Sequence, residues 1–253
     1  MAANCAVAEV DGLFDGSLRL RQPARGHRVG ADAVLLAAAA PKVTGGLIVD
    51  VGAGVGAVGL ALAMWNPRAR VVLLEKNPAA AALARENIPL NGLEDRVRAV
   101  EADLFDVTAR KAANLSEAAD LVVTNPPYLA PGAARASPDP DRAMAHVLEE
   151  GGVEKWLRAA LSLLRPNGCL VAIHRADALG DLLAATSGRL GALRVLPVFP
   201  REGEKAMRVI LRGRKGSKGP LALLPGLVLH QADGRFTPLA DDIHRHGRRI
   251  FED

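Results

Sequence analysis

The stretch GLIVDVGAGVGAVGLALAMW, residues 46–65, consists of a short apolar run, a glycine-rich turn and a longer apolar segment. The run over 46–51 has the length of a buried strand, and the segment over 57–65 is typical of a helix that ends before Pro67. A strand that enters a helix through glycines brings the helix N–H groups close to any ligand at that edge. The stretch therefore predicts an α/β fold with a binding crevice at the carboxyl end of this strand.

Strand-like and helix-like segments alternate on both sides of this stretch. The expected elements are a helix from 31 that ends before Pro41, strands over 70–76, 97–105, 119–125 and 169–175, and helices over 78–92 and 152–168. Alternation of this kind predicts a parallel sheet that is covered by helices on both faces.

After residue 190 the pattern changes, because two strand-like runs over 193–200 and 206–215 are separated by only five residues. That gap is too short for a crossover helix, so the two runs should form an antiparallel hairpin at the edge of the sheet. We therefore predict an α/β, Rossmann-like doubly wound sheet that is mostly parallel, with an antiparallel C-terminal hairpin. The chain is expected to be a single domain over 1–253, made of an N-terminal segment, a core and a C-terminal extension of unassigned packing; their bounds are 1–44, 45–215 and 216–253.

Composition limits the class of protein. A chain of 253 residues with 49% hydrophobic residues can bury one large core, which argues against global disorder. Cys5 and Cys169 lie far apart and have no ligand partners at metal spacing, so neither a disulfide framework nor a metal site is predicted. The N-terminus lacks the pattern of a signal peptide, and no apolar run approaches the ~18 residues that span a membrane. We expect a cytoplasmic protein without a membrane partner.

The glycine turn matches two ligand-binding patterns. Residues 54–59 fit the G-x-G-x-x-G fingerprint of dinucleotide-binding folds, and residues 50–56 fit an acid-x-G-x-G-x-G turn that binds S-adenosylmethionine. The second pattern is carried by Asp50, Gly52, Gly54 and Gly56. Glu75 ends the next strand, where a carboxylate would bind ribose hydroxyls in either case. These residues predict an adenosine-bearing ligand and leave its identity open.

The following two strands also end in polar residues. Asp103 follows the third strand, where a carboxylate could accept a hydrogen bond from an adenine amino group; a helix cap or an exposed acid explains it equally well. The fourth strand ends in the sequence Asn125-Pro126-Pro127-Tyr128, and Tyr128 is the only tyrosine of the chain. Prolines cannot donate to a sheet, so this strand must stop here.

With these residues in order, the chain resembles the Asn-Pro-Pro-Tyr class of S-adenosylmethionine-dependent methyltransferases, which act on planar amide or aromatic amino nitrogens. The resemblance covers roughly residues 20–215, and GHRVGADAVLLAAA over 26–39 is similar to the bacterial tRNA (valine) adenine-N6 methyltransferase family. It implies the class I methyltransferase fold, S-adenosylmethionine as cofactor and a pocket that includes residues before the first strand. The implied cofactor-binding residues are Arg28, Gly30, Asp32, Asp50, Gly52, Gly54, Gly56, Glu75, Asp103, Leu104 and Asn125. For Asp32, a capping role stays open.

The chemistry of nitrogen methylation accounts for the Asn-Pro-Pro-Tyr residues. An adenine amino group is a poor nucleophile, and the Asn125 side-chain oxygen and the Pro126 carbonyl would accept its hydrogen bonds as positive charge develops. Pro127 stiffens the turn without adding a donor, and Tyr128 would stack on the base. No general base is required, so His174 is expected to be a surface or packed residue.

Two basic segments, over 19–28 and 208–218, suggest a nucleic-acid substrate, although solvated surfaces would look the same by charge alone. If they clamp the backbone of a tRNA or another structured RNA, phosphate contacts should make the affinity sensitive to salt. The candidate RNA-binding residues are Arg19, Arg21, Arg25, Arg208, Arg212, Arg214, Lys215 and Lys218.

The interpretation that we favour is methylation of an adenine N6 amino group in tRNA, and three alternatives stay open. The nearest is N5-glutamine methylation of a protein, which the short segment before the glycine turn disfavours. A small-molecule O-methyltransferase would more often need a base or a metal ion beside the acceptor oxygen. A non-catalytic RNA-binding or nucleotide-binding module is disfavoured by the intact Asn-Pro-Pro-Tyr sequence. The oligomeric state and the nucleotide position are left open.

Overall fold

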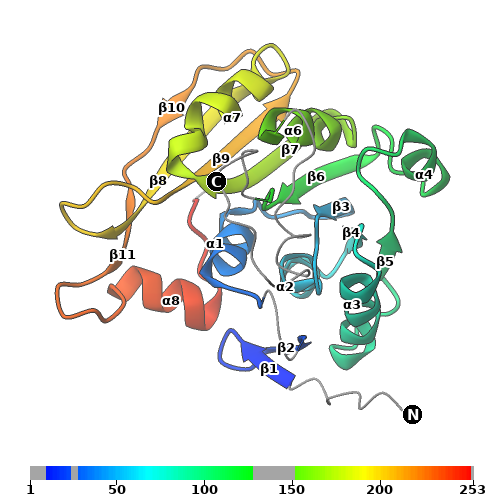
Figure 1. The fold of residues 1–253 in the computed structure, drawn as a ribbon, viewed down its shortest axis with the longest axis horizontal. Helices are drawn as coiled ribbons and strands as arrows, with labels where there is room; N and C mark the ends of the chain where they lie inside the picture. Colours follow the sequence, from blue (N-terminus) through cyan, green and yellow to red (C-terminus); the bar gives the residue numbers. More distant parts are fainter. Residues whose placement is uncertain (1–9, 24–27, 128–151, 252–253) are drawn as a thin grey trace, which may run out of the picture.

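The computed structural model describes residues 10–23, 28–127 and 152–251, and a nine-stranded sheet runs through its centre (Figure 1). The strands are β3 (Gly46–Val51), β4 (Ala69–Glu75), β5 (Val97–Glu101), β6 (Ala119–Thr124), β7 (Leu164–Arg175), β8 (Leu190–Arg201), β9 (Arg208–Lys215), β10 (Ala222–Leu223) and β11 (Leu227–His230). Their order is β10-β8-β9-β7-β6-β3-β4-β5, with β11 also paired to β8. Neighbours from β5 to β7 are parallel, which confirms the predicted doubly wound sheet.

The strand order reverses at β3, which pairs with β4 on one side and with β6 on the other. Val51 and Thr124 are register partners at the ends of β3 and β6. The next residues, Gly52 and Asn125, therefore leave neighbouring strands at the same edge of the sheet. Ligands of doubly wound folds bind at such a switch point.

Helices cover both faces of the sheet and define two hydrophobic cores (Figure 1). The helices are α1 (Ala31–Ala39), α2 (Ala57–Trp65), α3 (Pro78–Leu90), α4 (Val107–Ala112), α6 (Gly152–Leu161), the 3₁₀ turn η1 (Ala176–Ala178), α7 (Leu179–Thr186) and α8 (Pro238–His246). Buried residues of α1, α2, α3 and α8 belong to the first core, and those of α6 and α7 belong to the second. Burial on both faces explains the continuous apolar runs of β3, β4 and β6.

The predicted C-terminal hairpin is confirmed, because β8 and β9 pair antiparallel with Pro197 opposite Val209. Its expected place at the edge of the sheet is wrong. Strand β9 lies between β7 and β8, and β10 and β11 add to the outer side of β8 in parallel. Residues 216–251 therefore extend the sheet, and Ile243 of α8 joins the first core.

The helix expected over 152–168 is shorter than predicted, since α6 ends at Leu161 and β7 begins at Leu164. Pro166 lacks an N–H, and Asn167 adopts a φ of 62°, so the chain cannot continue as a helix there. Helix α7, which the sequence did not suggest, follows β7 and packs against α6.

A second sheet at the N-terminal side was also not expected. Strands β1 (Val10–Leu13) and β2 (Leu18–Arg21) form an antiparallel hairpin. Two asparagine amides hold it, one within α3 and one at its C-cap: Asn87 Oδ1 accepts from Arg21 N at 2.6 Å, and Asn91 Oδ1 accepts from Arg19 N at 2.9 Å. The hairpin thus closes one side of the first core.

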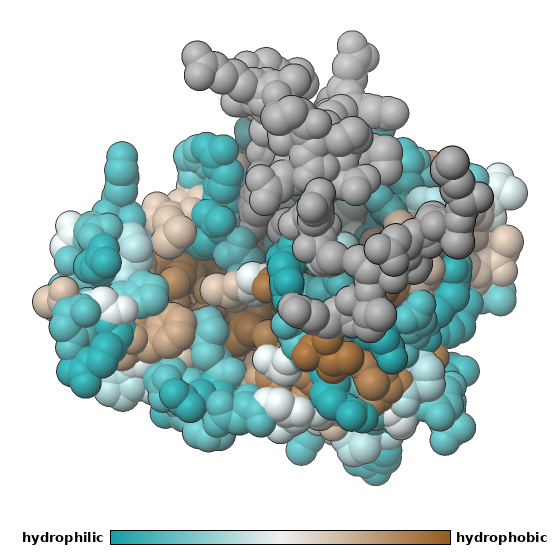
Figure 2. Space-filling view, turned by 60° about the horizontal axis from the view of Figure 1, so that its bottom comes forward, coloured by the Kyte–Doolittle hydropathy of each residue, from teal (hydrophilic) through white to brown (hydrophobic). Residues whose placement is uncertain are grey.

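Figure 2, which brings the lower side of Figure 1 forward, shows a described surface that is largely hydrophilic, with apolar patches beside the residues drawn in grey. Within the described ranges, no helix combines the length and apolarity that crossing a membrane demands.

Candidate active site

The glycine turn between β3 and α2 is built from backbone that only glycine adopts easily. Gly56 caps α2 with a φ of 93°, and a Cβ there would lie 2.8 Å from Leu73 Cδ1. A Cβ on Gly54 would meet nothing within 4 Å, so this part of the turn borders open space. Gly52 N donates to Leu74 O at 2.9 Å and fixes the turn against β4.

Glu75, the last residue of β4, reaches the glycine turn directly. Its Oε2 accepts a hydrogen bond from Gly54 N at 2.8 Å, and its Oε1 accepts from Asn77 N at 2.8 Å. The structure thus brings together the glycine turn and the acid that the sequence predicted to accompany it.

Asp50 lies beneath the turn and is only 2% exposed. Its Oδ2 accepts from Gly59 N at 2.8 Å, near the N-terminus of α2. Burial raises the pKa of Asp50 to about 7; the Gly59 N–H opposes this shift, and the negative charge of Glu75 adds to it. The side chain therefore supports the glycine turn from inside the fold, and its predicted contact with a cofactor stays a prediction.

The raised pKa of Asp50 makes stability depend on pH. Between the ordinary pKa of 3.8 and about 7, the folded state holds a proton that the unfolded state has lost, so stability falls as pH rises. Asp50→Asn is therefore expected to gain stability relative to the wild type, by on the order of a few kcal/mol from pH 4 to pH 8. Urea unfolding across this range checks it, and parallel pH profiles of the two proteins would contradict it.

Asp103, between β5 and α4, is partly exposed. Its Oδ2 lies 2.8 Å from Lys76 Nζ, and its Oδ1 accepts from Phe105 N at 2.9 Å. Burial raises the pKa of Asp103, but these hydrogen bonds and the charges of Lys76 and Lys155 outweigh it and hold the pKa below its ordinary value. The carboxylate is thus charged at neutral pH.

Leu104 is 4% exposed and belongs to the second hydrophobic core. The buried side chain offers almost no surface to a ligand, so a contact of Leu104 with the cofactor would have to come from its backbone; that contact stays a prediction.

The Asn125 turn begins directly after β6. Pro126 is buried, whereas Asn125 and Pro127 are partly exposed, and Tyr128 lies outside the described residues. Thr124 Oγ1 donates to Val51 O at 2.9 Å, which ties the ends of β6 and β3 together. The glycine turn and the Asn125 turn are thus neighbours across one pair of parallel strands.

Known proteins match the chain along most of its length. The methyltransferase small domain model matches residues 27–178. The chain belongs to the methyltransferase small domain family. It is 33% identical over 220 residues to the tRNA1(Val) (adenine(37)-N6)-methyltransferase of Porphyromonas gingivalis, with 83% of this chain and 84% of that protein covered. The prediction of a methyltransferase is confirmed.

Solved structures support the same fold. The "predicted O-methyltransferase" of Agrobacterium tumefaciens is 31% identical, with a TM-score of 0.72 and coverage of 87% of this chain and 98% of that one. TYW2 of M. jannaschii, solved in complex with AdoMet, has a TM-score of 0.57 at 18% identity, with 85% and 88% covered. At that identity the likeness shows the fold alone. The predicted class I methyltransferase fold is confirmed.

The N-terminal candidates of this methyltransferase lie around the start of α1. Arg28 pairs with Asp11, and Gly30 is the N-cap of α1. Asp32, in the first turn, forms a two-pronged ion pair with Arg208 Nε of β9 at 2.9 and 3.1 Å. The ion pair therefore joins Asp32, a predicted cofactor-binding residue, to Arg208, a predicted RNA-binding residue. Each side chain partly neutralises the charge of the other.

The remaining basic candidates do not form one surface. Arg19 donates to Leu90 O at 2.8 Å at the end of α3, and Arg21 lies 3.6 Å from Glu86. Arg25 lies outside the described residues. Arg212 is 8% exposed and lies over the Phe251 ring, so we remove it from the predicted RNA contacts.

Arg214, Lys215 and Lys218 lie at or beyond the end of β9, which runs antiparallel to β7. The carboxyl end of β9 is therefore at the opposite edge of the sheet from the glycine turn. The clamp that the sequence suggested over 208–218 is split, with only Arg208 at the edge of the candidate site.

Two groups near the site were not predicted as functional. Trp156 of α6 donates from Nε1 to Thr124 Oγ1 at 2.9 Å, and its ring lies 3.0 Å from where a Gly52 Cβ would be. The same ring meets Phe105 edge-on at 6.0 Å. Trp156 thus contacts the end of β6 and the segment after β5, and its ring lies against the glycine turn after β3. No sequence signal links it to them, because a long segment separates it from Asn125.

His174, at the end of β7, is 5% exposed. Burial lowers its pKa, more than hydrogen bonds to the backbone of Pro127 and Arg175 raise it. The expectation of a packed histidine agrees with this burial, and its contact with Pro127 places it beside the Asn125 turn.

Trp156→Phe keeps an aromatic ring but removes the hydrogen bond to Thr124. We expect a loss of about 1 kcal/mol in stability and a decrease in kcat of several-fold. Because Trp65 and Trp156 are the only tryptophans, the emission of Trp65→Phe should change when S-adenosylmethionine is added, and that of Trp156→Phe should not. An unchanged emission in Trp65→Phe would place the cofactor elsewhere.

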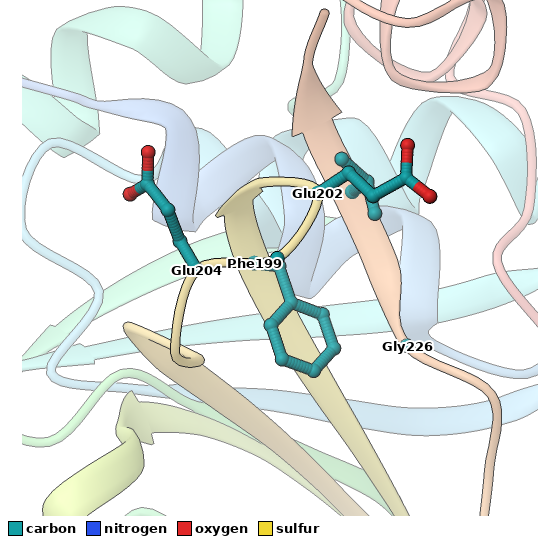
Figure 3. Close-up of a pocket in the computed structure, with 6 residues that line it drawn as sticks. Phe199, Glu202, Glu204 and Gly226 are labelled. Carbon is teal, nitrogen blue, oxygen red and sulfur yellow. The ribbon is translucent and has the colours of Figure 1, made fainter.

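One cavity at the same edge of the sheet differs from this site. It has about 390 Å³ and is lined by the turn between β8 and β9 and by the start of β11. Figure 3 shows the carboxylates of Glu202 and Glu204 pointing away from the Phe199 ring. Its described lining residues include two acids and no cation, which makes it unsuited to phosphate groups.

In the described part of the chain, His, Cys, Asp and Glu side chains nowhere gather in a group of three or more that could hold a metal ion. Cys169 is buried, and its Sγ lies 3.7 Å from Leu170 O.

Proposed function

We propose that the chain transfers a methyl group from S-adenosylmethionine to the exocyclic N6 amino group of an adenine in tRNA. One observation carries the proposal: the Asn125 turn directly adjoins the glycine turn at the switch point of the sheet. The relative from Porphyromonas gingivalis, a tRNA1(Val) (adenine(37)-N6)-methyltransferase by name, supports both the base and the class of RNA.

The residues at the glycine turn fit an adenosine-bearing methyl donor. Gly54 borders open space, and the Glu75 carboxylate lies within hydrogen-bond distance of that glycine. Glu75 would bind the ribose hydroxyls, and Asp103 would accept from the adenine amino group of the donor. When bound, the donor supplies an electrophilic methyl group.

The Asn125 turn supplies two oxygen acceptors to the attacking nitrogen. The Asn125 side chain and the Pro126 carbonyl would accept the two N–H groups, which stabilises the nitrogen as positive charge develops on it. Buried Pro126 keeps these acceptors in place. Tyr128 would stack on the base and hold its nitrogen in line. The proton can leave after transfer, so the step needs no base.

A second candidate function is O-methylation, because the structure from Agrobacterium tumefaciens carries that name. A hydroxyl acceptor would need a base, and His174 is a described candidate with a lowered pKa. Its 5% exposure argues against direct contact with an acceptor. We therefore favour the amino group.

The test is to incubate the protein with labelled S-adenosylmethionine and either unmodified total RNA or a protein extract. We expect label in the tRNA fraction and none in protein. Label in a protein glutamine would support the glutamine methyltransferase alternative, and label in neither would contradict a macromolecular acceptor.

A further inference from the structure

Helix α6 spans the sheet from the candidate site to the opposite edge. Near its start, Trp156 contacts Thr124 at the carboxyl end of β6. Just beyond its end, Ser162 O accepts from Glu117 N at 3.0 Å, two residues before β6 begins. The helix thus runs antiparallel to β6, and its ten residues span about 15 Å.

Two exposed cations lie on the same side of this helix. Lys155 and Arg158 are three residues apart, and Ser162 follows four residues later, so the three share one face. Lys155 Nζ lies 5.0 Å from the centre of the Phe105 ring, close to Asp103 and the site. Arg158 lies one turn further along α6, toward the opposite edge of the sheet. Its guanidinium pairs with Glu154, one turn before it on the helix.

Beyond Arg158 the same face opens into a cavity of about 620 Å³. Four cations, two hydroxyl groups and one acid are among its described lining residues; the acid, Glu117, pairs with Lys215 Nζ at 2.8 Å. The cations and hydroxyl groups are Arg110, Arg158, Arg189, Lys215, Ser116 and Ser162. Arg110 is 8% exposed and donates to Ser162 Oγ, and its buried Nε has no protein partner. A buried guanidinium that lines an open cavity with a spare donor favours an anionic ligand.

We propose that Lys155, Arg158, Arg189 and Lys215, here called the α6 track, bind the phosphate backbone of the RNA whose adenine enters the site. The proposal rests on the proposed function. A loop adenine at Asn125 would leave the adjoining stem free to lie along α6, and the cavity at its end takes a backbone phosphate. Bound phosphates contact cations mainly as point charges, which positions the RNA without reading its sequence.

The other described edges suit this role less well. The cavity beside the turn between β8 and β9 is acidic. Arg208 pairs with Asp32, whose side chain is only 21% exposed, whereas the acidic partners of Arg158 and Lys215 are 43% and 67% exposed and are screened more strongly by solvent. Helices α6 and α7 lie side by side (Figure 1), so Arg189 just after α7 continues the cationic face of α6. Of the predicted RNA residues, only Lys215 lines the cavity.

The test compares two triple variants that lose the same charge. The track variant carries Lys155→Gln, Arg158→Gln and Arg189→Gln. The control variant carries Lys42→Gln, Arg68→Gln and Arg70→Gln. The three control residues are also exposed, and they lie before β3 and around the start of β4. The affinity of each for an unmodified tRNA is measured by filter binding between 50 and 300 mM salt. The slope of log K against log[salt] is negative, and we expect its magnitude to decrease by about 2 in the track variant and to stay near the wild-type value in the control.

Equal slopes in the two variants would overturn the track. Methyl transfer by the wild type to the same tRNA separates failure of the track from failure of the proposed function. If the wild type methylates the tRNA and the slopes are equal, only the track is refuted. If it methylates no RNA, the proposed function is refuted. Inorganic phosphate is the second arm. If it raises the melting temperature of the wild type but not of the track variant while the RNA slopes agree, the cavity binds a small phosphate compound and the RNA proposal is wrong.

Discussion

Asn125→Ala is expected to lower kcat for methyl transfer about 10²–10³-fold, because it removes a fixed acceptor that faces the nitrogen in the transition state. The affinity for S-adenosylmethionine should change by no more than about threefold, since the glycine turn and Glu75 are untouched. Single-turnover rates and calorimetric titration of the cofactor measure the two quantities. Equal losses in both would mean that the turn after β6 has collapsed.

Asn125→Asp serves as the matched control, because the carboxylate keeps an oxygen acceptor at nearly the same place. It should retain more activity than Asn125→Ala at neutral pH. If the two variants are equally slow, the side-chain oxygen does not assist the transfer. The amide N–H₂ group or the shape of the turn is then responsible for the activity of the wild type.

Glu75→Ala is expected to weaken binding of S-adenosylmethionine by about 10–100-fold, because a charged acceptor for ribose hydroxyls is worth about 1.5–3 kcal/mol. It also removes the acceptor for Gly54 N, so the glycine turn loses an anchor. Isothermal titration measures the cofactor affinity, and urea unfolding measures the accompanying loss of stability.

Glu101→Ala is the control for this variant. Glu101 is the register partner of Glu75 on β5, but it pairs with Arg85 and makes no contact with the glycine turn among those the structure describes. Its effect on cofactor affinity should be small. Equal weakening by the two substitutions would indicate a general effect of removing negative charge from this edge.

Much of the fold could be predicted because the buried strands are short continuous apolar runs between helices that stop at proline or glycine. Gly52 to Gly56, Glu75 and Asn125 lie at the ends of such strands, and the topology of a doubly wound sheet fixes where those ends meet. Their proximity could therefore be inferred before any coordinates. The strand order of the hairpin could not, because the sequence alone does not say on which side of β7 the chain returns.

Burial was harder to infer than position. Asp50 and Leu104 belong to matching motifs, yet both side chains are buried. Asp50 lies in β3, which is covered on both faces, and Leu104 lies in the turn after β5, where the strand period no longer applies. Arg212 looked like part of a basic run but is buried with its neighbours, because β9 lies between β7 and β8 inside the sheet. Trp156 acts through contacts between segments far apart in the chain, which leave no local pattern.

The most direct measurement is the identity of the methylated atom. Unmodified tRNA is treated with the protein and S-adenosylmethionine, digested to nucleosides and separated by liquid chromatography with mass spectrometry. We predict N6-methyladenosine from the wild type and a strongly reduced amount from Asn125→Ala. A methyl group on a ribose oxygen, or on a base nitrogen other than adenine N6, would contradict the account.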